Sequence, residues 1–356
     1  MVSLRVGIVG LGQVAQITHL PVLSSLRQLY EVTAVSEISA ELRERVGDEY
    51  SIPRRYPTAQ DLLEKEEVDV LFVLTPDETH TEIAVAALDA GVHVFVEKPL
   101  CLCLREAEEI RAAQQRSGKQ VMVGYMRRYA SAFLEAKKQL GTCAPINYAR
   151  ARGIVGENGL VIGQTATFVS AGLPKRTLDE SRARRRKLLT EAIGDLPDEY
   201  VRAYRELCGL GCHDLSALRE LLGPPRGVVA ARTWRDGRFT TALLDYGDFV
   251  AGYESGIDSQ LRFDAHIEVQ GEFGSLTLRY DTPYIRHFPT RLHVEETDYP
   301  ALRLATLRPT LKDPYTEELE HLHRAISSGT GPKTDVDDFI ADLELFRAIV
   351  LAAAQS

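Results

Sequence analysis

Short apolar runs separated by amphipathic stretches recur through the first third of the chain. Runs without polar alternation are typical of strands buried on both faces, as in a parallel sheet. The stretches between them, such as AELRERVGDEY and LREAEEIRAAQQRSG, have the spacing of amphipathic helices. The pattern predicts a doubly wound parallel α/β domain over residues 1–124. Its strands are expected at LRVGIVG (4–10), EVTAVSE (31–37), VDVLFVLTP (68–76), GVHVFVEKP (91–99) and QVMVGYM (120–126).

The remainder of the chain, residues 125–356, follows a different pattern. Several segments alternate apolar and polar residues and have turn residues between them. A period of two predicts a largely antiparallel open sheet with one face packed on helices. We therefore expect a second domain of the α+β class, whose other sheet face must meet a further surface. The segments are PINYARARGIVG (145–156), RGVVAARTW (226–234), TTALLDYGDFVAGYESG (240–256), AHIEVQG (265–271), GSLTLRY (274–280) and RLHVEET (291–297).

A charged, mostly helical insertion is predicted near residues 173–208 of the second domain. Asp179 or Ser181 is the expected N-cap of its helix. The favoured interpretation of its basic run is a solvated helix face. The alternative is a lid that closes over the substrate or offers arginines to an acidic one. The basic residues are Arg182, Arg184, Arg185, Arg186 and Lys187.

Charge and composition narrow the function classes. The 356 residues carry a formal net charge of −9, which argues against nucleic acid as a general partner. No apolar run approaches the roughly 20 residues that span a bilayer, and the first residues read as a strand rather than a signal peptide. We expect a cytoplasmic protein without membrane contact. Five irregularly spaced cysteines indicate free thiols, and no ligand set for a metal is complete.

The first apolar run leads directly into GLGQVA, a G-x-G-x-x-A motif. Gly10 permits a tight turn, Gly12 lets the backbone approach a pyrophosphate, and Ala15 keeps the helix close to the strand. Glu37 ends the next strand, where a carboxylate accepts hydrogen bonds from the adenosine ribose. The context predicts a Rossmann dinucleotide-binding domain that prefers NAD, with NADP as an alternative. The cofactor-binding residues expected here are Gly10, Gly12, Gln13, Val14 and Glu37.

Two other strand ends carry polar residues. The sequence TPDETH (75–80) follows one strand and EKP (97–99) ends another. Ligands of open α/β sheets collect beyond the carboxyl ends of the strands, so both motifs are assigned to the cofactor site. The alternative for Lys98 is a surface salt bridge, and for His80 it is a helix-capping role. The residues assigned are Thr75, Pro76, His80, Glu97 and Lys98.

In this order and spacing, GLGQVA, TPDETH and VEKPL resemble the glucose–fructose oxidoreductase / inositol dehydrogenase (Gfo/Idh/MocA) family of NAD(P)-dependent oxidoreductases. The resemblance continues through VGYMRRYASAFLEAKK (123–138), GEFGSLTL (271–278) and the closing helices. It implies a dehydrogenase acting on CH–OH groups of sugars, cyclitols or related polyols, in a homodimer or homotetramer. It also implies that Lys98 bonds the reacting hydroxyl and that His213 accepts its proton, which an imidazole suits at neutral pH.

The stretch GLGCHDLS (209–216) departs from the family pattern. Gly209 stands where the pattern has an aspartate four residues before the histidine, and Ser216 replaces a second aspartate. Asp214 is expected to face away from the site and to act as a helix-start residue favoured by the dipole. Another group must then support His213, and the candidates are Tyr200, Tyr204 and Glu206. Substrate-binding residues are predicted at Arg127, Asn158, Gln164 and Tyr204.

Three functions remain open at this point. The first is an NAD-dependent polyol dehydrogenase. The second is a redox-neutral enzyme that keeps its NAD while it oxidises a sugar transiently. The third is a non-catalytic, dinucleotide-binding regulator. The presence of both Lys98 and His213 argues against the regulator, since a sensor needs neither residue.

Overall fold

The computed structural model describes residues 3–157, 159–165, 167–170 and 172–356. The chain divides into two compact units. The first comprises the chain up to Gly124 together with Val161–Ala192 and Glu318–Ala341. The second comprises Tyr125–Leu160, Ile193–Glu317 and Asp342–Ser356. Two segments that follow the predicted boundary at residue 124 thus pack with the nucleotide-binding unit.

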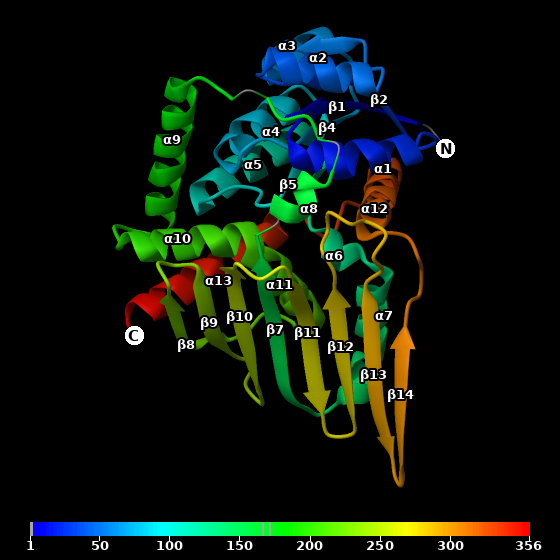
Figure 1. Cartoon of the computed structure of the whole chain (residues 1–356), viewed down its shortest axis with the longest axis vertical. Helices are drawn as coiled ribbons and strands as arrows, with labels where there is room; N and C mark the ends of the chain where they lie inside the picture. Colours follow the sequence, from blue (N-terminus) through cyan, green and yellow to red (C-terminus); the bar gives the residue numbers. More distant parts are fainter. Residues whose placement is uncertain (1–2, 158, 166, 171) are drawn as a thin grey trace. The chain divides into compact units, whose positions relative to one another are not determined.

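The first unit is built on a six-stranded sheet in the order β3-β2-β1-β4-β5-β6, of which β1, β2, β4 and β5 are labelled in Figure 1. Every neighbouring pair is parallel, and β4 and β6 are buried along their whole length. The predicted doubly wound fold is confirmed, and the five predicted strands are present. The strands are β1 (Leu4–Val9), β2 (Tyr30–Ser36), β3 (Arg54–Tyr56), β4 (Val70–Val73), β5 (His93–Glu97) and β6 (Val121–Gly124).

Helices connect these strands, as the amphipathic stretches predict. The first crossover helix begins at Gln13, passes through a π-helix, η1 (Ala15–His19), and continues as α1 (Leu20–Ser25). Ser39 and Thr58 cap α2 and α3 through side-chain oxygens that accept backbone N–H groups. The remaining elements are α2 (Ala40–Glu49), α3 (Ala59–Lys65), the 3-10 turn η2 (Asp77–Thr79), α4 (His80–Asp89) and α5 (Leu104–Ser117).

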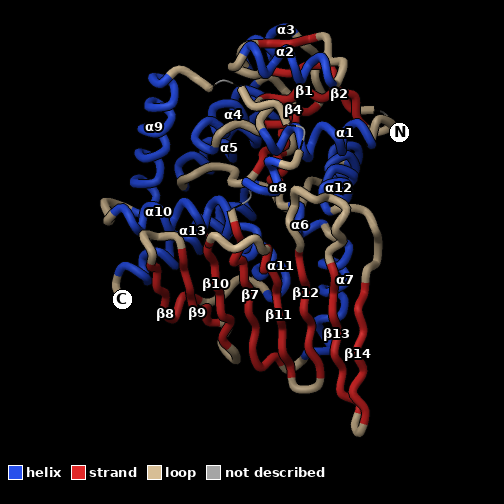
Figure 2. Tube along the Cα trace, in the orientation of Figure 1, coloured by secondary structure: helices blue, strands red, loops and turns tan. Residues whose placement is uncertain are grey.

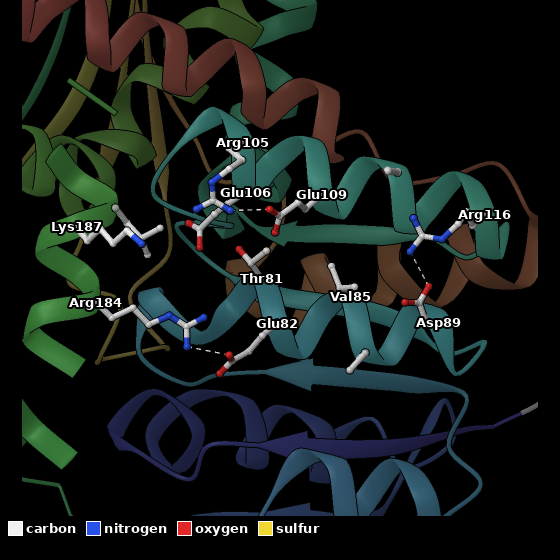
Figure 3. Close-up of a pocket in the computed structure, with 13 residues that line it drawn as sticks. Thr81, Glu82, Val85, Asp89, Arg105, Glu106, Glu109, Arg116, Arg184 and Lys187 are labelled. Atoms are coloured by element: carbon white, nitrogen blue, oxygen red, sulfur yellow. Dashed lines mark hydrogen bonds and ion pairs between the residues drawn. The ribbon is translucent and has the colours of Figure 1, made fainter. Parts of the chain in front are cut away.

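The charged insertion forms a long helix, α9 (Lys175–Ile193), in the first unit. The helix begins before Asp179 and Ser181, so the predicted capping role of these residues is wrong. Ser181 bonds instead to Glu78, a fully buried carboxylate that Arg185 also contacts. Arg184 pairs with Glu82 of α4 (2.8 Å; Figure 3). Arg105 of α5 pairs with Glu191 of α9 (2.8 Å).

These ion pairs fix α9 against α4 and α5, and Leu188 and Leu189 of α9 are buried. A groove of about 770 Å³ lies between the three helices (Figure 3). The outward face of α9 carries paired, exposed charges such as Arg176–Glu180. The insertion therefore combines one packed face with one solvated face. The groove is lined by Thr81, Glu82, Val85, Ala86, Asp89, Arg105, Glu106, Glu109, Ala112, Arg116, Arg184, Lys187 and Leu188.

The second unit contains an eight-stranded sheet in the order β14-β13-β12-β11-β7-β10-β9-β8 (Figure 2). All its neighbouring pairs are antiparallel except β10 with β7. The predicted, largely antiparallel sheet is confirmed. Its strands are β7 (Ile146–Gly156), β8 (Gly227–Trp234), β9 (Phe239–Asp245), β10 (Val250–Asp258), β11 (Phe263–Gly271), β12 (Gly274–Tyr280), β13 (Arg291–Asp298) and β14 (Ala301–Leu307).

Burial alternates along these strands, so one face of the sheet forms the core of the second unit. Ala149, Ala151, Tyr253 and Ile267 are buried on that face. The other helical elements described are α6 (Met126–Tyr129), α7 (Ser131–Gln139), η3 (Leu140–Cys143), α8 (Gly159–Gly163), α12 (Pro314–Ser328) and α13 (Val336–Ala354). None of the helices in the described ranges is both long enough and apolar enough to cross a membrane.

A nearly continuous helical stretch carries the histidine motif GLGCHDLS (209–216). It consists of α10 (Asp198–Glu206), the π-helix η4 (Leu207–Gly211) and α11 (Cys212–Leu222). Gly211, the residue before α11, has helical dihedral angles (φ −61°, ψ −26°). The motif therefore spans the end of η4 and the first turn of α11.

Candidate functional site

The glycine loop after β1 has the shape that a dinucleotide phosphate requires. Gly10 has φ +91°, and a Cβ at this position would lie 2.7 Å from the carbonyl oxygen of Leu74. Only glycine fits there without strain. A Cβ at Gly12 would meet nothing within 4 Å, so this backbone borders open space. Gln13 and Val14 begin the helix that follows, where N–H groups can bind a phosphate.

Glu37 lies beside this loop at the end of β2. One carboxylate oxygen accepts the backbone N–H of Leu11 (2.9 Å), and the other accepts that of Ser39 (2.9 Å). Arg43 donates to the carbonyl oxygen of Glu37 (2.8 Å). The carboxylate is thus fixed next to the glycine loop, at the place where the ribose of a dinucleotide is expected.

His80 joins the two loops that follow β4 and β5. Its Nδ1 lies 2.8 Å from the carbonyl oxygen of Pro99, and its Nε2 lies 2.7 Å from that of Thr75. The side chain is buried, and Thr79 rather than His80 holds the N-cap position of α4. His80 is instead the C-cap residue of the 3-10 turn η2, and its side chain ties together the backbones of Thr75 and Pro99.

Glu97, which precedes Lys98, is held by a histidine that the sequence reasoning missed. His19 of η1 is fully buried, and its Nε2 lies 2.7 Å from a carboxylate oxygen of Glu97. The other oxygen accepts the backbone N–H of Lys98 (3.1 Å). Burial alone would raise the pKa of Glu97, but His19 and the charge of Lys98 hold it below its usual range. The only sign of this contact in the sequence was a histidine four residues after Ala15 of the glycine motif.

Lys98 is therefore bracketed by two anchored neighbours. Glu97 is fixed by His19, and the Lys98–Pro99 peptide leads to a carbonyl that contacts His80. Lys98 itself is half-buried. Thr75, His80, Glu97 and Lys98 thus come together at one edge of the first-unit sheet, as the sequence predicts for strand ends.

In the second unit, His213 lies on α11 and is 7% exposed. Its imidazole meets the ring of Tyr125 edge-on, with ring centroids 6.4 Å apart. Tyr204, one of the candidates for supporting His213, is also buried. Lys98 belongs to the first unit and His213 to the second.

Asp214 lies in the first turn of α11, as expected for a helix-start residue. It is fully buried, and its Oδ1 pairs with Nη1 of Arg127 (2.5 Å). A Cβ at Gly153 would lie 2.2 Å from Oδ2 of Asp214, so glycine leaves the room that this carboxylate occupies. Burial raises the pKa of Asp214 to about 6, although Arg127 favours the charged form.

The predicted substrate residues are dispersed. Arg127 is buried between Asp214 and the ring of Tyr280, which its guanidinium carbon approaches to 4.8 Å. Gln164 is exposed and belongs to the first unit. Asn158 lies outside the described residues. Among the described residues, no group of three or more His, Cys, Asp or Glu is arranged to hold a metal. All five cysteines are buried thiols.

Comparison with known proteins agrees with these motifs. A family model described as "Oxidoreductase family, NAD-binding Rossmann fold" matches residues 4–125. Inositol 2-dehydrogenase of Salmonella paratyphi B is 35% identical over 137 residues, which are 38% of this chain and 40% of that protein. Inositol 2-dehydrogenase 2 of Saccharopolyspora erythraea is 26% identical over 339 residues, which are 92% of this chain and 86% of that protein.

Solved structures share the fold over nearly the whole chain. Aldose-aldose oxidoreductase from Caulobacter crescentus, complexed with glycerol, has a TM-score of 0.76 at 22% identity and covers 99% of this chain and 98% of its own. Myo-inositol 2-dehydrogenase from Lactobacillus plantarum has a TM-score of 0.73 at 21% identity, covering 99% and 97%. The resemblance drawn from the motifs is confirmed: residues 4–125 match the model of an oxidoreductase family with an NAD-binding Rossmann fold, and inositol 2-dehydrogenases are among the similar proteins.

Proposed function

We propose that the chain is an NAD-dependent oxidoreductase that transfers hydride between a hydroxyl or ketone of a sugar, cyclitol or related polyol and nicotinamide. The observation that carries the proposal is the fixed position of Lys98, at the same sheet edge as the glycine loop. Both of its sequence neighbours are anchored by buried histidines. Hydrogen bonds that fix the residues on both sides of one lysine are typical of a preorganised site.

In the proposed reaction, Lys98 donates a hydrogen bond to the oxygen of the reacting hydroxyl. His213 accepts the hydroxyl proton as the carbonyl forms, which requires a neutral imidazole. When bound, the nicotinamide supplies the hydride chemistry. The glycine loop, with Gly10, Gly12, Gln13 and Val14, holds the pyrophosphate, and Glu37 holds the ribose.

The proposed preference for NAD rests on Glu37. Its carboxylate is held in place by two backbone N–H groups, and a fixed negative charge there repels a 2′-phosphate. The names of some structural neighbours include NADP, as with the 3-ketoreductase of Actinomadura kijaniata. Thus NADP is the competing cofactor to be measured beside NAD.

We also propose a homodimer or homotetramer in the cytoplasm. The outer face of the second-unit sheet supports the assembly, because it carries exposed apolar side chains at both edges. Trp234 and Leu243 are 41% and 44% exposed near one edge, and Leu302 and Leu304 are 61% and 68% exposed at the other. Between them, Arg152 pairs with Asp264 and Arg150 with Glu268. Sedimentation analysis measures the assembly directly.

The test of the activity is a panel of sugars and cyclitols with NAD and NADP, followed at the absorbance of reduced nicotinamide. Turnover that Lys98→Ala abolishes, while cofactor binding persists, is the expected result. Lys119→Ala, at a half-buried lysine of the same unit, is the matched control. Reduced cofactor retained without net turnover favours the redox-neutral alternative. Stoichiometric binding of NAD without either result favours the regulator.

A further inference from the structure

Residues 167–170 lie against the elements that hold a dinucleotide in a Rossmann domain, although they come from beyond its predicted boundary. Gln16 of η1 makes a two-point contact with Phe168. Its amide nitrogen donates to the carbonyl oxygen of Phe168 (3.1 Å), and its amide oxygen accepts the N–H of Phe168 (2.7 Å). The same amide nitrogen donates to the carbonyl oxygen of Leu11 in the glycine loop (2.8 Å).

The segment also contacts the ribose side of the site. The hydroxyl of Ser39 donates to that of Ser170 (2.9 Å), and the backbone N–H of Ser39 is one of the two donors to Glu37. Arg45 of α2 lies over the ring of Phe168, with its guanidinium carbon 4.6 Å from the ring centroid. Residues 167–170 therefore bridge the helix that starts at the glycine loop and the helix that follows Glu37.

The helix that follows this segment is itself fixed to the first unit. Along the chain, α9 begins at Lys175, and its residues Ser181 and Arg185 both contact the buried Glu78. The bridging segment thus has one end tied to a packed helix. A segment held in this way is expected to move as a hinged unit on a slower timescale than a side chain.

We propose that residues 167–170 form a clasp over the adenosine-ribose end of the dinucleotide site, so that cofactor exchanges only when the clasp opens. The proposal rests on the dinucleotide binding proposed above. In this proposal Phe168 and Ser170 retain the cofactor. Their contact partners in the closed clasp are Gln16, Ser39 and Arg45. The clasp contacts residues adjoining both Glu37 and the glycine loop, so opening it exposes both to solvent.

The experiment measures the dissociation rate of NADH by stopped-flow fluorescence, with excess unlabelled NAD as the displacing ligand. Phe168→Ala and Arg45→Met remove the ring contact from its two sides. A cation–π contact of this kind corresponds to roughly a fivefold change in rate, so both variants should release NADH about fivefold faster. Val169→Ala is the matched control, because Val169 lies in the same segment and is 72% exposed.

Thermal melting of each variant tests whether the first unit remains folded. Arg45 is more than half exposed, so Arg45→Met tests the contact even if Phe168→Ala melts early. Release that is unchanged in Arg45→Met, with NADH binding intact, overturns the clasp and leaves the proposed function standing. A wild-type protein that binds neither NADH nor NADPH overturns the proposed function, and the clasp with it.

Discussion

Glu97 in the first unit is only 12% exposed and Asp214 in the second is fully buried, and each carboxylate adjoins a residue proposed for catalysis. Glu97 accepts hydrogen bonds from His19 and from the backbone of Lys98, and its pKa lies below the usual range. Asp214 is paired with Arg127 through one oxygen, and burial raises its pKa to about 6. The same side-chain chemistry therefore carries opposite pH dependences in the two units.

The difference comes from the number of donors that surround each carboxylate. Two oxygens of Glu97 have donors, which offsets the cost of burial. The Oδ2 atom of Asp214 has no hydrogen-bond partner among the described residues, so burial dominates. In both units the catalytic candidate is positioned by an anchored sequence neighbour, but only the first unit has a fully bonded anchor.

The largest effect is expected from His213→Asn, which removes the proposed base and retains both neighbours. Turnover with the best substrate of the panel should fall by about 10²- to 10⁴-fold, while the melting temperature stays close to that of the wild type. Steady-state kinetics and a melting curve measure the two quantities. His287→Asn, at an exposed histidine of the same unit, is the control. Equal turnover in both variants would remove His213 from the mechanism.

Asp214→Asn should alter the pH dependence of stability. Because the pKa of the Asp214 carboxyl is raised in the folded state, the contribution of this group to the free energy of unfolding falls as pH rises from about 4 to 6. With a folded value of about 6, the wild type should lose up to about 3 kcal/mol relative to Asp214→Asn between pH 4 and 7. Chemical denaturation at several pH values measures this difference. Parallel curves would contradict the raised pKa, and the exposed Asp248→Asn is the control.

His19→Phe should have the opposite pH signature. Because the pKa of Glu97 is lowered in the folded state, its contribution is present at neutral pH and is lost as pH falls through the folded value. Losing the His19 hydrogen bond should cost about 1–3 kcal/mol at neutral pH and less in acid. Denaturation of His19→Phe in wild-type and Glu97→Gln backgrounds measures the coupling. An equal cost in the two backgrounds would show that Glu97 does not depend on His19.

The smallest effect is expected from Gly209→Asp, which restores the acid of the family pattern. A Cβ at position 209 meets nothing within 4 Å, so the second unit should fold normally. A carboxylate one helical turn before His213 favours the protonated imidazole. The acidic limb of the pH–rate profile should move to higher pH by about one unit. Gly194 is exposed, but its φ of +84° would strain any side chain placed there, so it cannot serve as a control position. Gly209→Asn is the uncharged control.

The apolar runs were sufficient to predict the doubly wound sheet, because buried parallel strands have little other sequence freedom. They missed β3, whose residues are Arg54, Arg55 and Tyr56, since a short edge strand needs no apolar run. They also missed β14, in which Leu302 and Leu304 are exposed. In both cases pairing with a neighbouring strand, rather than burial, defines the element.

The site was predictable where its residues follow strand ends. Glu37, His80 and Lys98 lie at the sheet edge that their positions in the sequence indicate. The partners that orient them were not predictable, because His19 and Glu97 are 78 residues apart and Arg127 and Asp214 are 87 apart. Likewise, Glu78 and Arg185 are separated by 107 residues. Long-range pairing of charges leaves no periodic signal in a single sequence.

The discontinuous composition of the first unit has a consequence for synthesis of the chain. The hydroxyl of Tyr30 donates to the carbonyl oxygen of Leu319 (2.6 Å). The backbone N–H of Val123 donates to the carbonyl oxygen of Thr334 (2.8 Å). When residue 124 leaves the ribosome, these buried groups still lack their partners. Domains usually fold in chain order during translation. Here the nucleotide-binding unit becomes complete only after residue 341, by which point almost all of the second unit has been made.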